Sequence, residues 1–148
     1  MYEILLSLHS YLRWAVVILA VVVIVKALMG TLNKTEFTDS DRKPGLFFMI
    51  SCDVQLLLGL ILYAGVSPLM QTAFADFGAA MKDASLRYFA VEHILVMIIA
   101  LALVHVGYAK TKKGVGTIKA NRTALIFYGI AFLLMMSRIP WTDRPMFH

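Results

Sequence analysis

Two histidines, His9 and His93, occupy matching places in two of the four long apolar segments of this chain. Each lies about five residues inside the start of its segment, and both segments run the same way across a bilayer because successive spans alternate in direction. Neutral imidazoles are common metal ligands, and one on each side of a porphyrin can hold haem iron. The spacing therefore predicts a haem b site near the outer leaflet, with His9 and His93 as the metal ligands.

Four charged residues lie close to this level and are candidates for binding the cofactor. Arg13 is one turn further along the same helix face as the first histidine. Arg138 reaches the same level from the fourth segment, and Arg87 precedes the third. Guanidinium groups bind carboxylates in a bidentate manner, so we expect these arginines to hold the haem propionates. Glu92 is expected to orient an imidazole or to pair with an arginine.

Three further polar residues fall inside apolar segments, where a charged side chain is energetically costly unless it has a partner or a functional role. Asp53 and Gln55 are about 200° apart on a helical wheel, so only one of them can face the bundle axis. The other is expected to face a neighbouring helix or a second copy of the protein. His105 lies about 18 Å along its helix from His93 and cannot share an iron with it, so we expect a structural or interfacial role. Space for a flat macrocycle is expected at four small residues: Ala20, Gly59, Ala100 and Ala131.

The composition places these residues in a membrane. Of 148 residues, 60% are hydrophobic and 16% are charged, and the mean hydropathy is +0.78, whereas soluble domains have roughly 25% charged residues. Four apolar runs are each close to the ~20 residues that cross a bilayer: Ile4–Met29, Gly45–Val66, Tyr88–Tyr108 and Thr123–Pro140. We expect an all-α fold, a four-transmembrane-helix up-down bundle that forms one domain over residues 1–148.

The basic residues indicate the orientation, because Lys and Arg are favoured on the cytoplasmic side. Nine of them flank the first and third connections: Lys26, Lys34, Arg42, Lys43, Lys110, Lys112, Lys113, Lys119 and Arg122. Five lie toward the other side: Arg13, Lys82, Arg87, Arg138 and Arg144. Both chain ends are therefore predicted to face outward, in a multi-pass protein of the inner (cell) membrane. The net charge of +5 is explained by this topology, and no nucleic-acid-binding stripe is present.

The connections between the spans are too short for a separate domain. The first, Thr31–Pro44, is expected to stop at the Pro44–Gly45 pair that starts the second helix. The second, Ser67–Leu86, contains a segment, Phe74–Met81, that is expected to lie on the surface as a short amphipathic helix. The chain has no phosphate-cradling glycine motif, no Ser/His/Asp spacing and no paired cysteines, so hydrolase and nucleotide-binding functions have no support.

Four segments resemble a family of small bacterial four-helix integral membrane proteins often labelled cytochrome b-like. They are His9-Ser10-Tyr11-Leu12-Arg13-Trp14, Asp53-Val54-Gln55-Leu56-Leu57-Leu58-Gly59, Arg87-Tyr88-Phe89-Ala90-Val91-Glu92-His93 and Arg138-Ile139-Pro140-Trp141. The likeness covers nearly the whole chain. It implies a haem b electron carrier in which His9 and His93 match the histidine positions of the family.

Three functions remain open on the sequence. The leading one is a b-type cytochrome that carries electrons between membrane quinol and an outer-side redox protein, an electron carrier rather than a stand-alone enzyme. The second is a haem-free subunit or assembly factor whose polar cluster fixes packing and docks a partner, in a homodimer or a larger membrane complex; an outward-facing Asp53 or Gln55 would favour it. The third is a quinone or small-substrate site formed by His93, Glu92 and Arg138 without metal.

Overall fold

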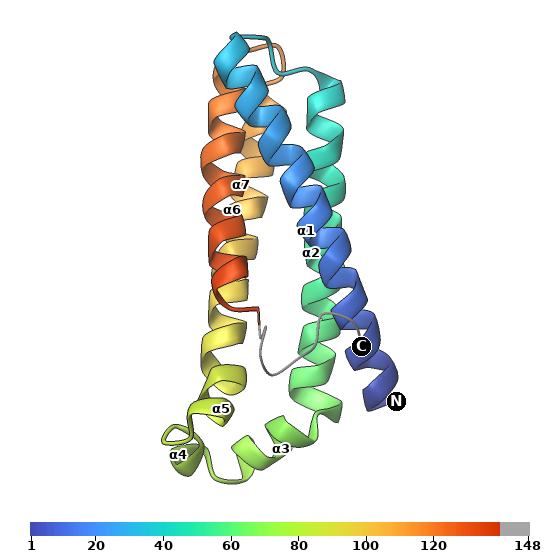
Figure 1. Cartoon of the computed structure of the whole chain (residues 1–148), viewed down its shortest axis with the longest axis vertical. Helices are drawn as coiled ribbons and strands as arrows, with labels where there is room; N and C mark the ends of the chain where they lie inside the picture. The colour runs from blue at the N-terminus through green and yellow to red at the C-terminus, as the bar shows by residue number, and fades with distance from the viewer. Residues whose placement is uncertain (140–148) are drawn as a thin grey trace.

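The computed structural model describes residues 1–139 of the chain, and these form an all-helical four-span bundle (Figure 1). The first span is α1 (Tyr2–Asn33), and the second is α2 (Asp39–Ile61) continued by a π-helical turn, η1 (Leu62–Val66). The third span joins α5 (Ala84–Arg87), a second π-helical turn η2 (Tyr88–Glu92) and α6 (His93–Lys113). The fourth is α7 (Lys119–Ser137). All four spans are long and apolar enough to cross a membrane, which confirms the predicted fold class.

The four spans run up and down in turn, and their packing gives a simple square arrangement. Helix α1 packs against α2 and α7, and α6 packs against the same two helices. The first and third spans are therefore diagonal to each other, which is where two facing ligands must lie. The connections at residues 34–38 and 114–118 meet at one end of the bundle, which we call the loop end, and α3 to α5 lie at the other (Figure 1). The assignment of the loop end to the cytoplasm remains a prediction from the Lys and Arg distribution.

The second helix begins earlier than the sequence analysis expected. Its N-terminus is a capping box: the Thr38 hydroxyl accepts a hydrogen bond from the Asp41 amide, and the Asp41 carboxylate accepts one from the Thr38 amide at 2.8 Å. These reciprocal bonds satisfy amides that have no partner within the helix. The predicted start at Pro44–Gly45 is therefore wrong, and Pro44 lies inside the helix. At the C-terminal end of the fourth span, α7 ends at Ser137. The predicted end of this span, Pro140, and the following Trp141 lie outside the described residues.

The connection between the second and third spans contains three short helices: α3 (Pro68–Ala75), α4 (Phe77–Ala80) and α5. A side-chain N-cap starts each of them, because Ser67, Asp76 and Asp83 accept hydrogen bonds from main-chain amides two or three residues ahead. The prediction of one surface helix over Phe74–Met81 is wrong in extent, since Asp76 ends α3 and begins α4 within that range.

The half of the bundle toward the loop end is tightly packed through glycines. A Cβ added to Gly30 would overlap the side chain of Asn121, and one added to Gly107 would lie 2.7 Å from Cβ of Phe127. Asn121 is itself fixed, because its Nδ2 donates a hydrogen bond of 2.7 Å to the carbonyl of Thr35. These contacts hold α7 close to α1 and to α6.

Small residues fill the centre of this packed region. Ala20, Ala100 and Ala131 are fully buried in the main hydrophobic cluster, which also contains Phe48 and Val104. The expectation that these three alanines leave room for a macrocycle is wrong, because close helix packing occupies that space. Toward the α3–α5 end, the α1–α2 pair and the α6–α7 pair diverge (Figure 1).

Candidate functional site

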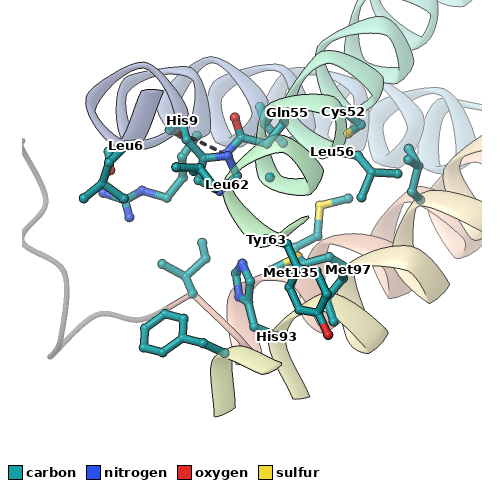
Figure 2. Close-up of a pocket in the computed structure, with 18 of the residues that line it drawn as sticks. Leu6, His9, Cys52, Gln55, Leu56, Leu62, Tyr63, His93, Met97 and Met135 are labelled. Atoms are coloured by element: carbon teal, nitrogen blue, oxygen red, sulfur yellow. Dashed lines mark hydrogen bonds between the residues drawn. The ribbon is translucent and has the colours of Figure 1, made fainter. Parts of the chain in front are cut away.

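A cavity of about 180 Å³ lies between the diverging helix pairs and is walled by side chains from all four spans (Figure 2). Its lining is mostly apolar. Eight residues with polar side chains line it: Tyr2, His9, Ser10, Arg13, Gln55, Tyr63, Ser67 and His93. Both predicted ligands therefore belong to one cavity, and His9 and His93 approach it from opposite walls, on the diagonal helices α1 and α6 (Figure 2).

The imidazole of His93 is held by the end of α7. Its Nδ1 lies 2.7 Å from the main-chain carbonyl of Arg138, and the Tyr88 hydroxyl donates a hydrogen bond to the same carbonyl. A carbonyl oxygen only accepts, so Nδ1 of His93 is the donor and carries the proton. In a neutral ring this leaves Nε2 with a free lone pair. An Nδ1–H donated to a carbonyl is the arrangement usual for metal-ligating histidines.

A π-helical turn precedes each of two cavity residues. In η2 the amide of His93 donates to the carbonyl of Tyr88, and in η1 the amide of Ser67 donates to the carbonyl of Leu62. Such turns interrupt an α-helix and occur frequently at functional sites. They also change the direction in which the following side chains point. Neither turn was predicted, because the apolar segments were treated as uninterrupted α-helix.

The imidazole of His9 is packed against α2 at Gly59. A Cβ at this glycine would lie 3.2 Å from Cε1 of His9, so the absence of a side chain makes room for the ring. The Gln55 side chain donates a hydrogen bond of 2.8 Å to the main-chain carbonyl of His9. The Nδ1 of His9 is buried and has no hydrogen-bond partner in good geometry, although the main chain of Gln55 lies near the ring.

Gln55 and Gly59 therefore belong to the site, although the sequence analysis did not assign Gln55 a role there. Their spacing of four residues places them on one face of α2, and that signal was present in the sequence. As their angular separation on the helical wheel predicts, Gln55 lines the cavity and Asp53 does not.

Arg13 is the one predicted propionate partner whose residue lines the cavity. It is 8% exposed, and its guanidinium carbon lies 5.6 Å from the ring centroid of Trp14. A cation over an aromatic face is favourable. This places a positive charge in the lining of a mostly apolar cavity.

The other three predicted cofactor residues lie beside the cavity but do not line it. Arg87 and Glu92 form an ion pair at 3.9 Å, so Glu92 pairs with an arginine rather than orienting an imidazole. Arg138 contributes its main-chain carbonyl to His93, while its Nη1 donates to the Ser137 carbonyl. The site thus uses the backbone of Arg138, a role that no sequence pattern indicates.

Asp53 and His105 form a second polar group, away from the cavity. Nε2 of His105 lies 2.6 Å from Oδ1 of Asp53, and the two side chains are 47% and 43% exposed. The bond joins α6 to α2 on the outside of the bundle. His105 is therefore remote from the predicted ligands, as its position along the helix requires.

The donor set fits haem better than a bare metal ion. Within residues 1–139 no group of three or more His, Cys, Asp or Glu side chains is placed to hold a metal, whereas haem iron takes only its axial ligands from protein. The cavity volume is below the ~300–1,000 Å³ typical of ligand pockets, so a haem requires its walls to move outward. Four methionines, whose side chains are flexible, line it: Met70, Met97, Met135 and Met136.

No family model, curated protein or solved structure matches this chain. The cavity and its residues therefore carry the information about function.

Proposed function

We propose that this chain is a membrane-embedded b-type haem protein that carries electrons between membrane quinol and an outer-side partner. The observation that supports it is that His9 and His93, from diagonal helices, face one apolar cavity from opposite walls (Figure 2). These two residues would be the axial ligands. Bound haem supplies reversible one-electron chemistry, which the side chains of this chain do not offer by themselves.

The chain contributes the binding and orientation of the group. The Arg138 carbonyl fixes the tautomer of His93 through Nδ1, which raises the basicity of the ligating nitrogen. Gly59 gives the His9 ring its place against α2. Arg13 is the cation in the cavity lining that would bind a propionate, since guanidinium binds carboxylate in two parallel hydrogen bonds.

In the predicted orientation, the position of the cavity along the bundle supports an outer-side redox partner. It lies in the half of the bundle that carries α3 to α5, the end predicted to face outward. A redox protein on the outer side would therefore approach near the cavity, while quinol reaches it from the bilayer.

The direct test is a visible spectrum of the detergent-purified protein, oxidised and then reduced with dithionite. We expect a Soret band and a sharp α-band in the reduced state, and their loss in His9→Ala and in His93→Ala. His105→Ala is the matched control: it removes an intramembrane histidine outside the cavity and should keep the spectrum. A folded, colourless wild-type protein from haem-replete cells, or an unchanged spectrum in both cavity variants, would contradict the proposal.

A haem-free membrane subunit is the second candidate, and the outward position of the Asp53–His105 pair favours it. In that case His9→Ala lowers stability without any change in absorbance, and the protein is recovered in a defined larger complex.

A metal-free quinone site has less support. Of its three predicted residues, only His93 lines the cavity, because Glu92 pairs with Arg87 and the Arg138 residue is not in the lining. Quinone bound stoichiometrically to haem-free protein would favour this function instead.

A further inference from the structure

The Asp53–His105 pair lies at an unusual place for polar groups, on the bilayer-facing surface of the bundle. Asp53 is ten residues past Lys43 and His105 is five before Lys110, about 15 Å and about 7.5 Å along their helices. Exposed apolar side chains surround them, among them Val54, Leu57 and Val106. The pair is therefore within the apolar part of the spans.

Half-exposed ionisable groups are unfavourable in this position. Polar side chains within membranes normally face the interior of a bundle or a neighbouring protein, because lipid offers no hydrogen-bond partners. The hydrogen bond of 2.6 Å between Nε2 and Oδ1 satisfies one nitrogen of the ring and one oxygen of the carboxylate. Nδ1 of His105 and Oδ2 of Asp53 have no partner among the described residues.

The two unused atoms are complementary to each other. A histidine Nδ1–H donates and a carboxylate oxygen accepts, so the surface lacks one acceptor for Nδ1–H of His105 and one donor for Oδ2 of Asp53. A second copy related by a two-fold axis supplies both, because each His105 can donate to the Asp53 of the other copy. The four side chains, two His105 and two Asp53, then alternate around a closed ring of hydrogen bonds. An identical chain satisfies this surface without any further type of residue.

The shape of α6 around the pair permits such an approach. Ala102 and Ala109, one turn on either side of His105, are both exposed. Small residues at a helix surface let a second helix come close enough for interhelical hydrogen bonds.

We infer that the α2–α6 face is the interface of a two-fold homodimer, closed by reciprocal hydrogen bonds between the Asp53–His105 pairs of the two copies. The inference is independent of the haem proposal, because the interface is outside the cavity and contains none of its lining residues.

Energy transfer between donor-labelled and acceptor-labelled copies in lipid vesicles tests the interface. Labels are attached at Lys112→Cys in a Cys52→Ala background, and the protein is diluted in lipid. The double variant Asp53→Leu/His105→Leu should associate about tenfold or more weakly, because two reciprocal contacts are lost. It should remain folded, since leucine suits a lipid-facing position. The exchange Asp53→His/His105→Asp keeps the complementarity and should associate like the wild type.

Cysteine cross-linking locates the contact independently. In the same background, mild oxidation should join copies through Ala109→Cys, which is on the proposed face. Leu133→Cys, at an exposed position of α7, is the matched control and should not cross-link above background. The inference would be overturned if the wild-type protein were monomeric at every protein-to-lipid ratio, or if the double leucine variant associated as strongly as the wild type. It would also be overturned if the folded exchange variant failed to associate, or if both cysteines cross-linked equally.

Discussion

Substitution of Gly59 offers a graded perturbation of one proposed ligand without removing it. A Cβ at this position lies 3.2 Å from Cε1 of His9, closer than an ordinary carbon contact. Alanine therefore requires the ring to move by a few tenths of an ångström, and the branched side chain of Gly59→Val requires more. Overpacking of this kind costs about 1–3 kcal/mol.

The free-energy cost of this overpacking depends on whether the His9 ring is held in place. In the haem-free protein His9 can turn into the adjoining cavity and relieve the overlap, so unfolding in a detergent titration should change little. When the ring is held as a ligand it cannot turn, so the same strain lowers haem affinity. A strain of about 1–3 kcal/mol corresponds to about 5- to 150-fold weaker retention.

Haem transfer to apomyoglobin, followed by the Soret band, measures that retention. The matched control is Gly129→Ala, because a Cβ there meets nothing within 4 Å, and its retention should equal that of the wild type. Gly59→Ala should fall between the control and Gly59→Val. If Gly59→Val retained haem as well as the wild type while keeping its fold, the argument that His9 is a ligand packed on Gly59 would be refuted.

Two further substitutions test how the bundle holds the site. Gly30→Ala should destabilise the protein by about 1–3 kcal/mol in a detergent unfolding titration, because its Cβ displaces Asn121 from a buried hydrogen bond. Adding Asn121→Ala should recover part of that loss, and two fully additive effects would argue against the contact. Tyr88→Phe removes one donor to the Arg138 carbonyl but leaves that of His93, so stability should fall by about 0.5–1.5 kcal/mol with no change in the absorption spectrum, and a spectrum lost in this variant would show that Tyr88 rather than the carbonyl orients the ring.

The sequence by itself determined the medium, the number of spans and the depth of the polar residues. Apolar runs of transmembrane length predict spans, and a rise of about 1.5 Å per residue converts position into depth. For that reason spacing alone was enough to place His9, His93 and Arg13 near one another, and all three line one cavity. Helix ends were less well predicted, because local bonds such as the Thr38–Asp41 capping box extend a helix beyond its apolar run.

Tertiary structure decided the direction in which each polar side chain points. This direction depends on the rotation of each helix about its axis. Contacts between helices, such as that of Gly30 with Asn121, set the rotation, whereas the length of the span does not. The turn η2 changes it again just before His93. The same geometry separates Gln55, which faces the cavity, from Asp53, which meets His105 on the bilayer-facing surface. Spacing along the chain fixes how deep a residue lies, whereas only the packing of four helices fixes what it faces.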